Sequence, residues 1–263
     1  MFEEFREFKK EMPKERDEFD ELIDEIRKEE KFGIKKNSSK SDLKENIDTE
    51  YLNNVEVVLN LFTIDKGIIK VLLLKKQDEP YKGHLMLPNK ILKHGENIQN
   101  AIDSIVYFDL KLDDIYIKQS CFMSNIMTKN DNSIVLSYIG IINVETLKQQ
   151  INKEIEYDLF PINDLPKIVY GYDIVIEKTK LDLKEILIKL NNIKLIFSKT
   201  FSISELQNIY EQIFNDKFDR RNFRKKFVRA GIVEETGNIN EQTNGRPAKL
   251  YRFKENSEDI TLF

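Results

Sequence analysis

The sequence predicts a two-domain α/β protein, in which a mixed α/β sandwich precedes a small helical domain that ends in a β-hairpin. From Val55 onward, short β-branched and apolar runs alternate with glycine turns, whereas from Ser198 onward helical periodicity and basic charge dominate. A chain of 263 residues, 40% hydrophobic, is long enough to bury two cores. We expect these domains at 51–168 and 198–257, joined by a connecting helix at 169–197 and preceded by a charged helical extension at 1–50.

Composition excludes several classes of protein. No run approaches the roughly 18 apolar residues that a membrane span needs, and the N-terminus lacks the basic-then-apolar order of a secretory signal, which predicts a cytoplasmic protein. The single cysteine, Cys121, excludes an internal disulfide and a cysteine-based zinc site. The net charge of −4 hides an uneven distribution: 12 basic against 17 acidic residues in 1–50, but 12 against 7 in 198–254.

The acidic extension carries one partial helical stripe of apolar side chains, followed by the polar stretch GIKKNSSKSDLKEN at 33–46. The stripe predicts a helix, interrupted near Pro13, and the polar stretch predicts a linker. Such a helix either packs on the body of the protein or on a sister chain, or serves as a dedicated arm for another partner.

The middle of the chain predicts the sandwich in detail. Residues 55–64 and 68–76 form a hairpin around the turn Asp65-Lys66-Gly67, and an amphipathic helix runs from about Asn97 to Asp109. Further strands are predicted at 115–124 and 133–144, on either side of a polar loop at 128–132. After Pro166, a long amphipathic helix at about 173–191 can join the two domains rigidly.

The last zone has the order of a winged helix-turn-helix. Ser202 or Ser204 can cap a first helix that ends near Phe214, and Asp219 caps a second helix that ends at Gly231. Strands at 232–236 and 247–253 then flank a wing loop at 237–245.

The second helix has the composition of a DNA-reading helix. Six of the eleven residues at 219–229 are basic, and Phe223, Phe227 and Val228 form an apolar face, so the basic side chains must line the opposite side. Arginine and asparagine there can address base edges in a major groove, while lysine neutralises phosphate. The predicted DNA-binding residues of helix and wing are Arg220, Arg221, Asn222, Arg224, Lys225, Arg246 and Lys249. The alternative is a solvated basic face without a ligand.

The segments SELQNIYEQIF, DRRNFRKKF and GRPAKLYRF resemble the C-terminal domain of the Nudix-related transcriptional regulators, whose best-known branch represses bacterial NAD biosynthesis genes. The resemblance covers roughly residues 55–253. It implies a Nudix-like α/β/α sandwich followed by the winged helix, and a homodimer on double-stranded operator DNA.

A second segment, EPYKGHLMLPNKILKHGENIQNAIDSIVYFDLKL, resembles the Nudix box, LPGG followed by G-x5-E-x7-R-E-U-x-E-E-x-G-U, where U is a bulky aliphatic. Leu87, Pro88 and Glu96 match the pattern, while Asn89 and Lys90 replace the two glycines. The REUxEE core is Ser104 to Asp109, so Ile105 and Phe108 replace two of the three clustered acids that hold magnesium. We therefore expect no catalytic residue, no metal and no cofactor, and no hydrolase activity.

The resemblance implies that the sandwich is a sensor, with ADP-ribose as the effector in the NAD branch and sugar-related effectors among relatives with degraded boxes. The candidate ligand-binding residues are Lys75, Lys76, Asn89, Lys90 and Glu96. The leading hypothesis is a ligand-responsive regulator in which the helix at 173–191 changes the spacing of two reading helices. The alternatives are a Nudix hydrolase with a basic accessory domain, using Glu96, Asp109 and Glu154 or Glu156, and a DNA-binding protein whose sandwich only dimerises.

Overall fold

The computed structural model describes residues 55–93, 95–124, 134–240 and 247–254. The predicted N-terminal helix and linker, the polar loop at 128–132 and Arg246 lie outside these ranges. All of the described residues belong to one compact unit, Asn53–Phe263. No helix within the described ranges is long and apolar enough to cross a membrane.

One mixed sheet forms the centre of the sandwich. Its strands within the described residues are β1 (Val55–Asp65), β2 (Ile68–Lys75), β3 (Leu85–Met86), β4 (Asn89–Ile91), β5 (Tyr116–Ser124), β6 (Ile134–Ile141) and β7 (Tyr157–Pro161). The order is β3-β2-β1-β6-β5, with β4 paired to β1 and β7 to β2. The predicted hairpin is confirmed, because β1 and β2 are antiparallel with Asp65 opposite Ile68. Strand β1 also pairs in parallel with β6, which leaves it in the middle of the sheet.

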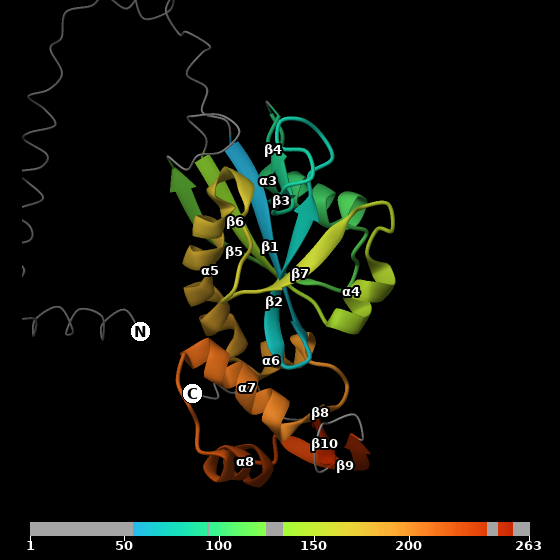
Figure 1. Ribbon diagram of the computed structural model, residues 1–263, viewed down its shortest axis with the longest axis vertical. Coiled ribbons are helices and arrows are strands. Elements are labelled where there is room, and N and C mark those ends of the chain that lie inside the picture. The colour runs from blue at the N-terminus through green and yellow to red at the C-terminus, as the bar shows by residue number, and fades with distance from the viewer. Residues whose placement is uncertain (1–54, 94, 125–133, 241–246, 255–263) are drawn as a thin grey trace, which may run out of the picture. The chain divides into compact units, whose positions relative to one another are not determined.

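Helices cover both faces of the sheet (Figure 1). Helices α3 (Ile98–Asp103), η3 (Ser104–Asp109) and α4 (Val144–Gln150) share one apolar cluster with the sheet, and α5 (Tyr172–Leu187) shares the other. Because both faces are covered, nine consecutive residues of β1 are buried. The predicted α/β/α sandwich is therefore confirmed.

The amphipathic helix predicted at 97–109 is confirmed, with one change of geometry. The side chain of Asn97 caps it by accepting from the Gln99 amide. From Ser104 the helix widens into the π form, in which the Leu110 amide donates to the Ile105 carbonyl at 2.9 Å. This widened turn contains the positions at which the Nudix pattern has its clustered acids.

The single long helix predicted at 173–191 is wrong. Helix α5 ends at Leu187, Lys189 is extended (φ −80°, ψ 131°), and a second helix, α6 (Leu190–Ile196), follows. The Asn192 side-chain amide donates to the Ile186 carbonyl at 3.0 Å and so satisfies an acceptor at the end of α5. A short 3-10 turn, η4 (Val169–Gly171), precedes α5.

The C-terminal part is a winged helix, as predicted. It contains β8 (Phe201–Ser202), α7 (Ile203–Phe214), α8 (Arg220–Arg229), β9 (Val233–Asn240) and β10 (Ala248–Phe253), with strand order β8-β10-β9. Ser202, not Ser204, caps α7, in a capping box with Glu205. Strand β9 is longer than predicted, because residues 237–240, whose glycine and asparagines suggested a loop, continue the strand to the Asn240–Ala248 pair.

The two parts share apolar packing. One cluster of buried side chains runs from the α5 face of the sheet through α5 and α6 to α7, α8 and the wing strands. The predicted boundaries at 168 and 197 stay predictions, since this core continues across them. The continuity indicates that the winged helix is packed against the sandwich and does not hang from a free linker.

Candidate DNA-binding surface and sensor pocket

Helix α8 is fixed by one buried aromatic face. The Asp219 side chain caps it by accepting from the Asn222 amide at 2.8 Å. Phe223 and Phe227 are buried, and their ring centroids lie 5.8 and 5.6 Å from that of Tyr210 on α7. Val228, predicted to share this face, is 39% exposed, because it lies about 100° further around the helix than Phe227.

The open side of α8 carries a shallow depression of about 580 Å³. It is lined by Asp219, Arg220, Arg221, Arg224, Lys225, Val228 and Arg229. The helix thus gathers four of the predicted DNA-binding residues at one place. Asn222 is exposed but does not line the depression, and Lys249 is on β10.

Two of the arginines are held by neighbouring elements. A guanidinium nitrogen of Arg220 donates to the hydroxyl of Ser204 on α7 at 3.0 Å. A guanidinium nitrogen of Arg224 donates to the hydroxyl of Tyr251 on β10 at 3.2 Å. These contacts hold the two side chains in place before a ligand binds, so that less conformational entropy is lost on binding.

The wing is less basic than its lysine and arginine suggest. The Lys249 ammonium lies 2.5 Å from a carboxylate oxygen of Glu235, and the Arg252 guanidinium lies 2.6 Å from Glu234. Both acids are on β9, across the hairpin from the bases. The number of charges along the sequence does not indicate this pairing, because it depends on the register of the two strands, which shifts between Lys249 and Tyr251.

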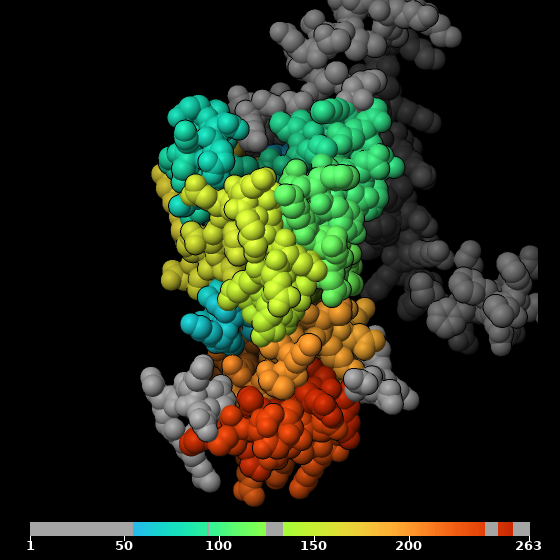
Figure 2. Space-filling view, turned by 90° about the vertical axis from the view of Figure 1, so that its right-hand side faces the viewer, coloured from blue at the N-terminus to red at the C-terminus, as the bar shows by residue number. Residues whose placement is uncertain are grey.

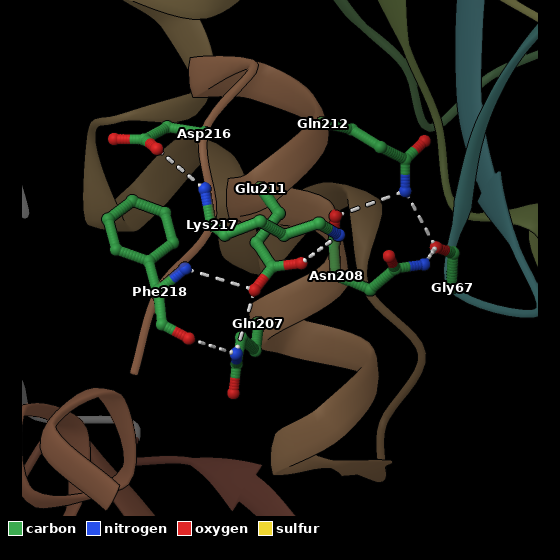
Figure 3. Close-up of polar contacts among 8 residues, drawn as sticks. All are labelled: Gly67, Gln207, Asn208, Glu211, Gln212, Asp216, Lys217 and Phe218. Carbon is green, nitrogen blue, oxygen red and sulfur yellow. Dashed lines mark hydrogen bonds and ion pairs between the residues drawn. The ribbon is translucent and has the colours of Figure 1, made fainter. Parts of the chain in front are cut away.

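The turn between α7 and α8 is organised by one glutamate (Figure 3). A Glu211 carboxylate oxygen accepts from the Lys217 ammonium at 2.7 Å. The other accepts from the Gln207 amide at 2.8 Å and the Phe218 backbone amide at 3.1 Å. These hydrogen bonds lower the pKa of Glu211 to about 2, with the Lys217 contact as the largest cause. Glu211 therefore ties the end of α7 to the segment that leads into α8.

A second polar junction joins α7 to the sandwich (Figure 3). The carbonyl of Gly67, in the turn between β1 and β2, accepts from the side-chain amides of Asn208 at 2.7 Å and Gln212 at 2.9 Å. The Ile69 backbone amide donates to the Gln212 side-chain oxygen at 3.1 Å. In both overall views this turn lies at the end of the sandwich next to the winged helix (Figures 1 and 2).

The sequence indicates the hairpin turn but not this junction. Gly67 has φ +72°, and a Cβ at this position would lie 3.4 Å from the Glu205 side chain. A glycine is therefore favoured both by the backbone conformation and by the close approach of α7. No spacing in the sequence indicates a contact between residues that are more than 140 positions apart.

Lys90, Glu96 and Asp109 lie where the Nudix resemblance implies a ligand pocket on the α3 side of the sheet, and these three residues are called the sensor pocket. The Lys90 ammonium lies 3.0 Å from one Glu96 carboxylate oxygen, and the Lys93 backbone amide donates to the other at 3.0 Å. These two hydrogen bonds, the backbone one first, lower the pKa of Glu96. Partial burial raises the pKa of Asp109, and the positive charge of Lys90 opposes that rise.

The other three candidate ligand residues are held elsewhere. Lys75 pairs with Glu156 at 3.1 Å, and the Lys76 ammonium donates to the backbone carbonyl of Asp78. The Asn89 side chain donates to the Leu87 carbonyl at 2.8 Å. The structure thus brings together only Lys90 and Glu96 of the five predicted residues, with Asp109 close by.

The residues of this pocket do not fit the magnesium that the Nudix fold implies. Ile105 is 1% exposed within the core, and Phe108 is 75% exposed where the pattern has a glutamate. Among the described residues, no group of three His, Cys, Asp or Glu side chains is placed to hold a metal ion. The turn itself survives, since Lys111, at the glycine position of the pattern, adopts φ +59°.

Comparison with known proteins matches both parts of the chain. The family model of the NrtR DNA-binding winged helix domain matches residues 196–253. The ADPR responsive transcriptional repressor NtrR of Acinetobacter baylyi is 27% identical over 210 residues, which cover 75% of this chain and 80% of the relative.

Two solved structures have the same fold. The crystal structure of Shewanella oneidensis NrtR complexed with a 27mer DNA has a TM-score of 0.59 at 22% identity and covers 76% of this chain and 93% of that one. A MutT/nudix family protein from Enterococcus faecalis has a TM-score of 0.51 at 17% identity, covering 86% and 98%. Together with the winged-helix match, these findings confirm the resemblance to the Nudix-related transcriptional regulators.

Proposed function

We propose that this protein is a ligand-responsive transcriptional regulator that binds operator DNA through α8. The observation that carries the proposal is the depression along α8, where Arg220, Arg221, Arg224 and Lys225 line one exposed surface. The match of residues 196–253 to a DNA-binding winged helix domain supports the same assignment. Arginines on one face of a short helix can contact guanine edges and phosphates when that helix enters a major groove.

Within this proposal, the helix makes the main contacts and the wing contributes less. Lys249 and Arg252 each have an acidic partner, which offsets part of the positive charge that they offer to phosphate. Arg220 and Arg224 instead donate to the neutral hydroxyls of Ser204 and Tyr251, which leaves their positive charge uncompensated by these contacts. A homodimer would place two such helices about 34 Å apart, one turn of DNA, on a palindromic operator.

The effector is proposed from the A. baylyi relative, which is named as responsive to ADPR. ADP-ribose, or another nucleotide or sugar derivative, would bind at the sensor pocket and change the affinity for DNA. An effector can do so only by binding the DNA-competent and incompetent arrangements unequally. The junction of Gly67 with Asn208 and Gln212 replaces the predicted long helix as the element that would transmit this difference.

We also infer that the protein is not a Nudix hydrolase. Nudix hydrolysis requires clustered carboxylates that hold magnesium against a diphosphate, and Ile105 and Phe108 supply none. Of the acids considered for an alternative site, Glu154 approaches Lys111 at 4.0 Å and Glu156 pairs with Lys75. The relative's name, a transcriptional repressor, agrees with this inference.

Binding of the full chain to a fluorescent mixed-sequence duplex tests the proposal. Affinity should fall as salt rises, and Arg221→Ala with Arg224→Ala should weaken binding at least about tenfold and reduce the salt slope by about 2. Lys249→Ala is the control at an ion-paired base of the wing and should change affinity less than about threefold, because Glu235 already offsets the charge of that lysine. Salt-independent binding, or an unchanged affinity in the double variant, would refute the assignment.

A further inference from the structure

The residues of the sensor pocket do not provide the cation site that the Nudix fold implies. The fold implies a divalent metal held by clustered carboxylates, but of the four acidic positions of the Nudix pattern this chain keeps an acid at Glu96 and Asp109, and it adds a lysine. That lysine stands at the second glycine position of the Nudix pattern, where the family has no side chain. A positive charge has therefore been introduced into a loop that in the family passes close to the diphosphate.

The geometry fixes where this charge lies. Strand β4 pairs with β1 so that Lys90 is opposite Val57, whose side chain belongs to the apolar cluster on the α3 face. Opposed residues of an antiparallel pair point to the same face, so the Lys90 side chain also extends toward α3. Its ammonium lies 3.0 Å from Glu96, and the side chains of Lys90 and Glu96 are only 27% and 15% exposed.

Glu96 is held from both sides, which fixes the ammonium in turn. One carboxylate oxygen accepts from the Lys93 backbone amide and the other pairs with Lys90. A metal ion that approached Glu96 would have to displace the ammonium or lie beside it, at the cost of repulsion between like charges. A phosphate oxygen is attracted by the ammonium, and it can accept from another of the three N–H groups while Glu96 keeps the first.

We propose that the Lys90 ammonium is the resident cation of the sensor pocket, and that a diphosphate-bearing effector binds there without a divalent metal. The proposal rests on the sensing role proposed above and adds the chemical class recognised. It also gives a function to Lys90, which stands where the Nudix pattern has a glycine. Nudix hydrolases hold a diphosphate substrate with magnesium and hydrolyse it. This pocket would hold a diphosphate without activating water for hydrolysis.

A metal titration tests the first half of the proposal without any effector. Mn²⁺ binding to the full chain, followed by electron paramagnetic resonance, should be at least tenfold tighter in Lys90→Ala than in the wild type. Adding Asp109→Asn to Lys90→Ala should abolish that gain. Equal Mn²⁺ affinity in the wild type and Lys90→Ala would overturn the claim that the lysine excludes the metal.

Thermal stabilisation by ADP-ribose and by inorganic diphosphate tests the second half. The wild type should show the same rise in melting temperature with EDTA as with Mg²⁺, since a bound ligand stabilises by mass action. Lys90→Ala and Lys90→Gln should each weaken the response at least tenfold. Lys180→Ala is the matched control, since it removes a comparably exposed lysine (25%) from an ion pair with Glu177 on α5.

Three results would overturn this half: a response that needs Mg²⁺, an unchanged response in both Lys90 variants, or no response of the wild type to either compound. DNA affinity measured without effector separates the two proposals. If DNA binding is intact but the Lys90 variants bind Mn²⁺ and diphosphate like the wild type, only the proposal for the sensor pocket is overturned. If the Lys90 variants behave as expected but the wild type does not bind DNA, only the proposal for α8 is overturned.

Discussion

Helices α3–η3 and α8 are built alike but present different chemistry to solvent. Each buries one apolar face, through Ile105 and Val106 in the first and Phe223 and Phe227 in the second. On the open face, the first has the exposed Phe108 where the Nudix pattern has an acid, whereas the second gathers arginines. The buried face thus preserves the fold, while the exposed face decides what chemistry the fold carries.

The largest expected effect concerns the buried faces. Phe227→Ala should lower the free energy of unfolding by about 3–5 kcal/mol and Ile105→Ala by about 2–5 kcal/mol, because each leaves a cavity in close-packed surroundings. Phe227 is fully buried and Ile105 is 1% exposed. Denaturant unfolding of the full chain measures both changes.

The matched controls are Val228→Ala and Phe108→Ala, on the open faces of the same two helices. They should change stability by no more than about 0.5 kcal/mol, since Val228 is 39% and Phe108 75% exposed. A loss of stability in Phe108→Ala as large as that in Ile105→Ala would mean that the open face also supports the fold.

The next effect concerns communication between the two regions. Asn208→Ala with Gln212→Ala removes every side-chain hydrogen bond that holds the Gly67 carbonyl on α7. If an effector normally changes operator affinity by about 5 to 150 fold, the ratio of the affinities with and without effector should be close to one in this double variant. DNA binding with and without ADP-ribose, followed by fluorescence anisotropy, measures the ratio.

Gln207→Ala is the control for this prediction. Gln207 lies on the same helix, but its side chain contacts only Glu211 and Phe218 among the hydrogen bonds described, all within the winged helix. Its loss should leave the effector response in place. A full response in the Asn208 and Gln212 variant would mean that the signal travels by the shared apolar core instead.

Much of the fold follows from local signals in the sequence. Gly67 marked the β1–β2 turn, and Asp219 and Gly231 marked the two ends of α8, because each residue type suits the backbone required there. The break between α5 and α6 could not be predicted in this way. Neither glycine nor proline stands at 188–189, and the break is accompanied by a hydrogen bond from Asn192 to the carbonyl of Ile186.

The candidate site was less predictable than the fold. Composition indicated the basic face of α8 correctly, since six cations on a short helix cannot all be buried. It could not indicate that Lys249 and Lys90 are paired with acids or that Arg224 is held by Tyr251. These contacts depend on strand register and on packing between elements, which residue spacing along one element does not contain.

The smallest expected effect is the pH dependence of the turn that positions α8. The pKa of Glu211 falls from its ordinary 4.5 to about 2 in the folded protein, chiefly through Lys217 and then Gln207 and Phe218. Since the folded protein binds this proton less readily than the unfolded chain, the contribution to stability is complete above pH 4.5 and is lost as pH falls toward 2.

Glu211→Gln removes this ionisation while keeping the shape of the side chain. The wild type should melt at a higher temperature than the variant at pH 6, and the two melting temperatures should converge between pH 4.5 and about 2, the range set by the shifted pKa. A difference that stays constant over this range would mean that the negative charge is not what holds the turn. The hydrogen bonds from Gln207 and Phe218 would then hold the turn without the negative charge.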